Sequence, residues 1–427
     1  MTDEVSVLRE PLSVSTIFAL ASGSLPCAVA LLRISGEEAR EIAERVHGVP
    51  PPRLASLRRL VDPADGSIID RALVLWLPGP GTATGEDTLE WHLHGGRAVV
   101  AAAERALLAL GCRPAEAGEF TRRAFANGRI DLTEAEGLAD LIAADSDAAR
   151  RAALAQADGA LSRAVNAWQT RTLGLAARVE AAIDTDEEVA VDLNTVCAEM
   201  VALAGELRGE LAGPSAERLR DGVRVVLAGP PNAGKSSLFN ALVGRDAAIV
   251  TPVAGTTRDV IEAAVEWDGV PLLLIDTAGQ RDTGDAVERL GVARARAAVA
   301  SADIVLWLGE DEPPPGALAL HPRADERVVV DGRLAVSVVT GEGLAGLREV
   351  VLERARDLLP GPDSLALTAR QRGAIAAAAD ALGAADDDPL LTAESLRQAN
   401  AAWDRLTGRA GTEEMLGELF GRFCVGK

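Results

Sequence analysis

The segment Gly229-Pro230-Pro231-Asn232-Ala233-Gly234-Lys235-Ser236 decides the fold of the chain around it. It follows an apolar run, Val223 to Ala228, that predicts a strand, and it precedes Ser237 to Val243, which predicts a helix. A glycine-rich loop between a strand and a helix is typical of a phosphate-binding P-loop, in which backbone N–H groups and the positive end of the helix face the phosphates. The segment therefore predicts a parallel α/β domain that binds a nucleoside phosphate.

Lysine is almost absent from the chain. Lys235 and the last residue, Lys427, are its two lysines, whereas arginine occurs 41 times. An ammonium group is a compact point charge and a guanidinium group is a wide planar fork, so a loop closed around a phosphate has room only for lysine. We expect Lys235 to reach the β- and γ-phosphates and to act in catalysis. The same argument makes Lys427 a candidate functional residue, with chance at a chain terminus as the alternative.

The bulk composition favours a reduced, cytoplasmic protein. A length of 427 residues predicts roughly two to four domains. No apolar run reaches the roughly 20 residues of a membrane span, and the acidic N-terminus does not resemble a signal peptide. The four cysteines have neither metal nor disulfide spacing. A net charge of −21 argues against non-specific nucleic-acid binding, although a local arginine patch or a partner could still hold RNA.

The order of predicted elements indicates a multidomain fold, α/β plus all-α. Two helical stretches flank an alternating strand–helix stretch, which predicts one helical domain interrupted by an inserted Ras-like GTPase-type domain. Gly213-Pro214 and Pro360-Gly361-Pro362 are the expected hinges. The predicted domains are 1–120 (α/β), 121–216 (helical, first part), 217–357 (P-loop domain) and 358–427 (helical, second part).

Two further motifs follow the P-loop in the order typical of GTPases. Gly255-Thr256-Thr257-Arg258-Asp259 predicts a switch that closes on Mg²⁺, for which Ser236 supplies another oxygen. Asp276-Thr277-Ala278-Gly279 follows a predicted strand, so Asp276 suits an indirect role at Mg²⁺ and the Gly279 N–H suits a γ-phosphate contact. Asp268-Gly269, between two apolar runs, predicts a hairpin turn. The alternative is a set of glycine turns without a nucleotide.

The motif that reads the base is degenerate. GTPases generally read guanine with Asn-Lys-x-Asp after a strand, and this chain has Pro322-Arg323-Ala324-Asp325. Asp325 is suited to accept from the guanine N–H groups, unless it is merely solvated, and Arg323 is suited to stack. Ser337, which opens the segment Ser337-Val338-Val339-Thr340-Gly341, is expected to help complete the guanine pocket. We expect guanine specificity with weakened affinity.

Taken together, the sequence resembles the MnmE family of tRNA-modification GTPases over essentially its whole length. Besides the GTPase motifs, the resemblance rests on three groups of residues: Leu31 to Gly36 with Thr84 to Asp87, the long segment Gly118 to Arg129, and the tail Cys424-Val425-Gly426-Lys427.

The resemblance implies a tRNA-modifying complex. It implies a homodimer through the N-terminal domains and a site for 5-formyltetrahydrofolate or a related tetrahydrofolate. It also implies a heterotetramer with an FAD-dependent MnmG-type partner, which modifies C5 of the wobble uridine (U34) of certain tRNAs. The implied folate contacts are Arg33, Glu90, Arg129 and Lys427, and Arg129 departs from an expected lysine.

The resemblance also implies potassium-activated GTP hydrolysis. Asn232 would bind K⁺ together with Thr251, Val253 and Thr256, and Thr257 would bind Mg²⁺; a turn-forming role is the alternative for Asn232. The P-loop residues expected to hold the nucleotide are Asn232, Ala233, Gly234, Lys235, Ser236 and Ser237. Glu288 and Gln280 are alternative candidates to orient the attacking water. We favour Glu288 because the residues that the resemblance assigns to potassium binding are present.

Three weaker signals remain open. Cys424 is either a reactive thiol of the modification chemistry or a buried residue beside Phe420 and Phe423. Glu90, His92 and His94 alternate along one predicted strand, so they share a face; a pocket wall is favoured over a zinc site. The acidic run 184–192 is either a solvated face or a contact for a basic partner.

Two other kinds of protein fit parts of the sequence. One is a ribosome-assembly or signalling GTPase that binds RNA without modifying it, but such proteins generally carry a basic module. The other is a degenerate nucleotide binder without turnover, suggested by Pro322 in the guanine motif.

Overall fold

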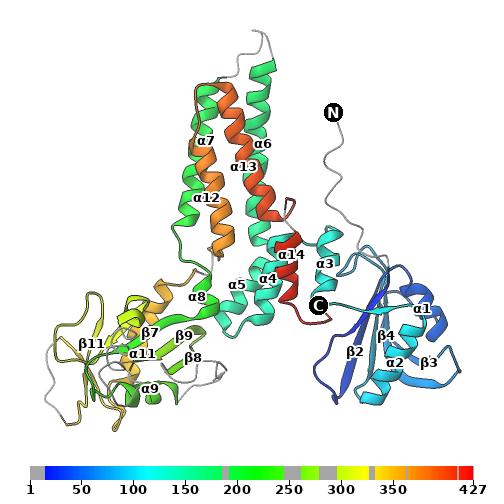
Figure 1. Cartoon of the computed structure of the whole chain (residues 1–427), viewed down its shortest axis with the longest axis horizontal. Coiled ribbons are helices and arrows are strands. Elements are labelled where there is room, and N and C mark those ends of the chain that lie inside the picture. Colours follow the sequence, from blue (N-terminus) through cyan, green and yellow to red (C-terminus); the bar gives the residue numbers. More distant parts are fainter. Residues whose placement is uncertain are drawn as a thin grey trace. The chain divides into compact units, whose positions relative to one another are not determined.

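The computed structural model describes residues 15–184, 192–244, 261–277, 296–326, 332–361, 364–410 and 413–426. The chain divides into two units, which are taken separately below (Figure 1). One comprises Met1–Ala139 with Thr407–Lys427, and the other comprises Asp140–Leu406. No helix in the described ranges combines the length and the apolar character needed to cross a membrane.

A six-stranded sheet in the order β3-β4-β5-β2-β1-β6 forms the centre of the first unit. Neighbouring strands pair antiparallel, except β1 and β6, which are parallel. The strands are β1 (Ile17–Leu20), β2 (Val29–Ser35), β3 (Ser56–Val61), β4 (Ile68–Leu77), β5 (Thr88–His94) and β6 (Arg113–Pro114). The helices are α1 (Ala39–Val46), α2 (Arg97–Ala109), α3 (Glu119–Ala126), α14 (Glu413–Gly421) and the start of α4 (Leu132–Ala143).

Alternation along β5 separates the core of this unit from the opposite face of its sheet. Leu89, Trp91 and Leu93 are buried, whereas the intervening Glu90, His92 and His94 are at least partly accessible. The same alternation places Arg33 of β2 directly across from Glu90. The prediction that Glu90 and the two histidines share one face is confirmed.

A buried polar network joins segments that are far apart in the sequence. Glu119, at the start of α3, is 1% exposed and accepts hydrogen bonds from Arg113 (2.5 Å) and Arg123 (3.1 Å). Arg123 also binds Glu86 (3.0 Å), which accepts from the Ser35 hydroxyl (2.8 Å). Burial alone would raise the pKa of Glu119, but hydrogen bonds from Arg113, the Glu116 amide and Arg123 lower this pKa to about 2. The network therefore fixes α3 against β2 and the 84–87 loop.

The C-terminal segment belongs to the first unit. A Cβ atom built on Gly118 would lie 2.2 Å from the Phe420 carbonyl oxygen, so α14 approaches the start of α3 as closely as glycine permits. Val425 forms an isolated antiparallel bridge with Ala117. A Cβ on Gly426 would lie 2.9 Å from the Leu20 carbonyl oxygen, so the tail reaches the end of β1.

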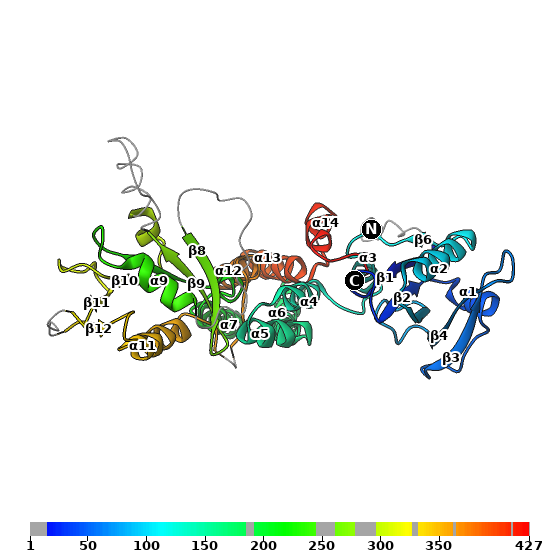
Figure 2. The ribbon, with the colours of Figure 1, turned by 90° about the horizontal axis from the view of Figure 1, so that it is seen from below.

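The second unit contains a sheet in the order β12-β11-β10-β7-β9-β8, in which only β8 runs antiparallel. Helices α9 and α11 share one apolar core with this sheet, and Figure 2 shows them beside it. The elements are β7 (Val223–Ala228), α9 (Lys235–Val243), β8 (Ile261–Trp267), β9 (Val270–Asp276), β10 (Ile304–Trp307), β11 (Leu318–Pro322), β12 (Leu334–Val336) and α11 (Leu344–Asp357).

The predicted turn between β8 and β9 is confirmed. Asp268 and Gly269 have φ angles of 47° and 81°, which suit the two-residue turn of an antiparallel hairpin. Arg348 of α11 holds this turn by a 3.5 Å ion pair with Asp268 and lies over the Trp267 ring at 5.3 Å.

Helices from both sides of the α/β segment form one bundle core. Trp168 stacks on Trp403 at 5.8 Å, although 235 residues separate them in the sequence. The predicted interruption of a helical domain is therefore confirmed, while the exact domain boundaries stay predictions. The bundle consists of α6 (Ala160–Asp184), α7 (Leu193–Leu211), α12 (Ala369–Gly383) and α13 (Pro389–Thr407), and the shorter α5 (Asp147–Ala157) and α8 (Glu217–Asp221) complete the unit (Figure 1).

We predict that Glu119→Gln destabilises the first unit by up to about 3–5 kcal/mol, because it leaves the Arg113 guanidinium without its ion-pair partner and removes one of the two carboxylates that bind the buried Arg123. The folded pKa of Glu119 is lowered, so its contribution is fully present above about pH 4.5 and declines as the pH falls toward about 2. Hydrogen exchange of the α3 and β2 amides in increasing urea measures the effect.

Glu394→Gln is the matched control. Glu394 also has a pKa lowered to about 2, by Arg397, but this pair is exposed on α13. Exposed pairs contribute little, so its exchange pattern should match the wild type. Equal behaviour of the two variants would show that the buried network does not stabilise the unit.

Candidate functional site

The candidate nucleotide site lies at the carboxyl ends of the parallel strands in the second unit. The P-loop follows β7, Asp276 ends β9, Asp325 follows β11 and Ser337 follows β12. Because these strands are parallel neighbours, their carboxyl ends lie along one edge of the sheet. Ligands of open α/β sheets bind at this edge.

The P-loop has the backbone that its sequence predicts. Asn232 and Gly234 have φ angles of 60° and 97°, and helix α9 begins at Lys235, two residues before the predicted Ser237. Lys235 is 6% exposed, and its ammonium group donates to the carbonyl oxygens of Gly229 (2.9 Å) and Pro230 (2.8 Å). The loop therefore surrounds a lysine.

Two buried charges act on each other at this edge. Burial lowers the pKa of Lys235, and the negative charge of Asp276 partly offsets this by raising the pKa. Asp276 is fully buried at the end of β9. The sheet thus brings together the two charged residues that the P-loop and the Asp276-Thr277-Ala278-Gly279 motif predict for the site.

The oxygen donors on this edge suit a magnesium ion. Ser236 and Ser237 are exposed in the first turn of α9, and Asp276 ends the adjacent strand. Hydroxyl and carboxylate oxygens are ligands that Mg²⁺ prefers. Asn232 is exposed, and its positive φ supports the turn-forming role without testing K⁺ binding.

The loops predicted to read the base lie next to each other. The Ala324 amide donates to the Val336 carbonyl (3.2 Å), which ties the loop after β11 to β12. Arg323 and Asp325 are exposed, whereas Ser337 is fully buried. The Ser337 hydroxyl accepts from the Thr340 amide at 3.2 Å, so this side chain shapes the loop; contact with a base stays a prediction.

Several predicted site residues lie outside the part of the chain that the structure describes. The roles proposed for them stay predictions, including the choice between Glu288 and Gln280. These residues are Thr251, Val253, Thr256, Thr257, Gly279, Gln280, Glu288 and Lys427.

A second polar site lies on the sheet of the first unit. Arg33 and Glu90 form an ion pair of 2.9 Å, and the Arg33 guanidinium lies 6.0 Å from the centre of the Phe120 ring. Arg129 is exposed, and its Cγ would lie 3.1 Å from a Cβ built on Gly85. The structure therefore places Arg129 beside the 84–87 loop and pairs two predicted folate contacts directly with each other.

One alternative from the sequence is resolved in this unit. Cys424 is exposed, so of the two alternatives left open by the sequence, the buried cysteine is wrong, although Phe420 and Phe423 are buried. Among the residues that the structure describes, no group of three His, Cys, Asp or Glu side chains could hold a metal ion.

Sequence reasoning missed Glu119 and Arg113 as the centre of the buried network. Glu119 and Arg123 are four residues apart, a spacing that places them on one face of a helix and was the available signal. The sequence carries no comparable signal for Arg113, because its contact with Glu119 depends on the turn between β6 and α3.

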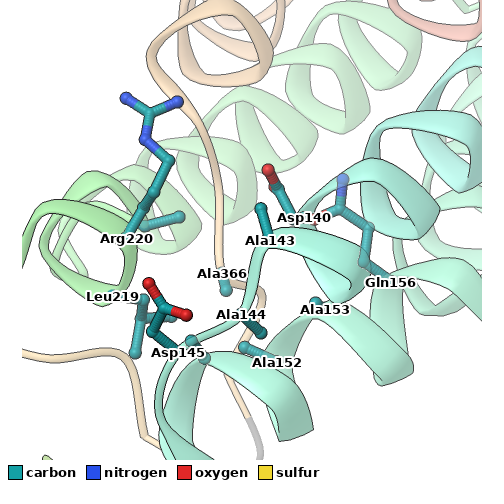
Figure 3. A pocket seen from close by; sticks show the side chains of 12 residues that line it. Asp140, Ala143, Ala144, Asp145, Ala152, Ala153, Gln156, Leu219, Arg220 and Ala366 are labelled. Atoms are coloured by element: carbon teal, nitrogen blue, oxygen red, sulfur yellow. The ribbon is translucent and has the colours of Figure 1, made fainter. Parts of the chain in front are cut away.

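The second unit also holds a small cavity between α4, α5 and α8 (Figure 3). Its volume is about 40 Å³, and alanines line most of it, with Asp140, Asp145, Gln156 and Arg220 at its polar positions. Pockets that hold small molecules are generally about 300–1,000 Å³. This cavity has room for little more than water.

Two family models together match most of the chain. Residues 16–129 match the GTP-binding protein TrmE N-terminus, and residues 132–424 match the MnmE helical domain. A "tRNA modification GTPase MnmE" of Rhizorhabdus wittichii is 57% identical, over 96% of this chain and 96% of the relative. The protein of the same name from Erythrobacter litoralis is 54% identical, over 96% of this chain and 100% of the relative. The solved G domain of the T. maritima FeoB iron transporter is 28% identical, with a TM-score of 0.24, over 31% of this chain and 98% of that chain. By the two family models and these relatives, the chain belongs to the MnmE family of tRNA modification GTPases.

Proposed function

We propose that the protein is a potassium-activated GTPase that takes part in tRNA modification. With an FAD-dependent MnmG-type partner, it would modify C5 of the wobble uridine (U34) of certain tRNAs, using a tetrahydrofolate one-carbon unit. The observation that carries the GTPase part is the P-loop closed around Lys235, with Asp276 on the adjacent strand and both base-reading loops along the same edge.

The nucleotide edge would act mainly by positioning and by charge. Lys235, which donates to the Gly229 and Pro230 carbonyls, would donate instead to β- and γ-phosphate oxygens. The N-terminus of α9 would face the phosphates. Mg²⁺, held by Ser236 and Thr257, would neutralise charge that develops on the phosphates. Asp276 is placed to orient the hydration shell of that ion, and Gly279 would contact the γ-phosphate.

Potassium would supply the remaining positive charge. Asn232 is exposed on the P-loop, where its side-chain oxygen is available to a cation, with Thr251, Val253 and Thr256 as the other proposed ligands. A cation at this point stabilises charge in the transition state of phosphoryl transfer. Glu288, in preference to Gln280, would orient the attacking water.

The first unit would bind the folate. Glu90 offers a carboxylate to ring N–H donors, and the partly exposed Arg33 offers a guanidinium to anionic groups. The tail residue Gly426 lies beside β1, which pairs with β2, and this supports the proposal that Lys427 belongs to the same site. Arg129 would contribute from its position beside the 84–87 loop, and the exposed Cys424 would take part in the modification chemistry.

The homodimer would use the face of the sheet on which Arg33 and Glu90 lie. Leu57, Leu73 and Val29 alternate with core residues of their strands and are 71%, 46% and 53% exposed. Exposed apolar side chains that gather on one sheet face favour association. A dimer at this face would place the folate site near the boundary between two copies.

We predict that Lys235→Arg abolishes GTP hydrolysis although it preserves the charge. The loop closes on the ammonium group through two carbonyl contacts below 3 Å, and a planar guanidinium does not fit that geometry. The rate should fall by at least about 100-fold, the size of the loss of one transition-state donor. Phosphate release from GTP and from ATP measures both turnover and base choice.

Arg224→Lys is the control, because Arg224 lies on the same strand, β7, before the P-loop. This variant should hydrolyse GTP at the wild-type rate. Undiminished hydrolysis by Lys235→Arg, or equal use of ATP and GTP by the wild type, would contradict the proposal.

We predict that Arg33→Gln weakens binding of 5-formyltetrahydrofolate about 10- to 100-fold, because a charge-assisted hydrogen bond is lost. Calorimetric titration of the full chain measures the affinity, and sedimentation velocity of the same samples reports the dimer. Arg59→Gln, at an exposed position on β3, should bind like the wild type. A wild type that binds no folate, or an Arg33→Gln variant of full affinity, would contradict the assignment of this site.

A further inference from the structure

One side chain ties the end of β9 to the strand that leads into the P-loop. The Thr277 hydroxyl donates a hydrogen bond to the Leu227 carbonyl oxygen at 2.8 Å. The parallel ladder between β7 and β9 has its last pair at Leu227 and Asp276. The threonine therefore adds a connection just beyond the ladder, at the point where both strands end.

The opposite side of β7 is held by the backbone. The Leu308 amide, after β10, donates to the Ala228 carbonyl oxygen at 2.8 Å. The Leu227 carbonyl thus accepts a hydrogen bond from the residue that follows β9, and the Ala228 carbonyl accepts one from the residue that follows β10. The contact with β10 persists whatever the side chain, whereas the contact from Thr277 depends on a hydroxyl group.

The register of β9 against β7 sets where two buried charges lie. Asp276 ends β9 and is fully buried, and Lys235 is buried in the loop that follows β7. Asp276 raises the pKa of Lys235 against the effect of burial, so the two charges interact. A shift of the β9 end would change this interaction and move the carboxylate relative to Ser236.

We propose that Thr277 is a positioning residue of the nucleotide site: its hydroxyl holds the Asp276 strand end in register with the strand that enters the P-loop. The inference rests on the proposed function, because it requires a nucleotide and Mg²⁺ at this edge. Thr277 exerts its effect through Asp276, so it governs how well the site uses Mg²⁺ more than how tightly the P-loop holds a nucleotide.

Thr277→Val and Thr277→Ser separate the hydroxyl from the rest of the side chain. Valine has nearly the shape of threonine and lacks the donor, whereas serine keeps the donor. In the full chain, fluorescence of mant-GDP titrated with Mg²⁺ gives the Mg²⁺ concentration for half-saturation, without any turnover. The same fluorescence in EDTA gives nucleotide affinity without Mg²⁺, and phosphate release gives kcat.

We expect Thr277→Val to raise the half-saturating Mg²⁺ concentration and to lower kcat, each by about 2- to 10-fold, the range of a single neutral hydrogen bond. Its mant-GDP affinity in EDTA should equal that of the wild type, and Thr277→Ser should restore both affected quantities. Thr170→Val is the matched control, because the exposed Thr170 donates to the Asn166 carbonyl (2.7 Å) within α6. It should leave all three measurements unchanged.

Three results would overturn the inference while leaving the GTPase function intact: wild-type Mg²⁺ dependence and kcat in Thr277→Val, equal impairment of the valine and serine variants, or a loss of mant-GDP affinity in EDTA. A wild-type protein that neither binds mant-GDP nor hydrolyses GTP would overturn the proposed function itself, and this inference with it.

Discussion

Parallel pairing of β7 with β9 and β10 is the constraint on which the nucleotide site depends. A parallel sheet delivers the ends of all its strands to one edge, so residues that are far apart in sequence arrive at one place. Lys235 and Asp276 interact there as buried charges of opposite sign, and a backbone hydrogen bond joins the loop after β11 to the end of β12 along the same edge. The ordered strand ends therefore bring the P-loop and the loops predicted to read the base to one edge of the sheet.

The two polar centres of the chain are built from different chemistry. In the first unit, Glu119 and Glu86 are bound by arginines, whose planar forks reach several oxygens at once. In the second unit, backbone carbonyls surround the single ammonium of Lys235. This contrast gives a physical reason for the composition of the chain: arginine binds carboxylates at most sites, whereas lysine occurs in the loop that closes around it.

Much of the fold was predictable from local sequence patterns. The P-loop, the Asp268-Gly269 turn and the shared face of Glu90 and His92 all follow from residue spacing, because backbone geometry fixes them locally. The exposure of Cys424 could not be predicted from local patterns, because it depends on how the tail packs against β1 and Ala117. The buried Glu119 network was missed for the same reason: its partners come from three separate segments.

The potassium requirement tests the central claim most directly, because it joins the P-loop geometry to turnover. GTP hydrolysis should be measured in KCl and in NaCl at equal ionic strength, for the wild type and for Asn232→Ala. The account predicts strong stimulation by potassium that disappears in the Asn232 variant. Equal rates in the two salts, with activity lost in Gln280→Ala, would contradict it and indicate a mechanism in which a glutamine positions the water without a second cation.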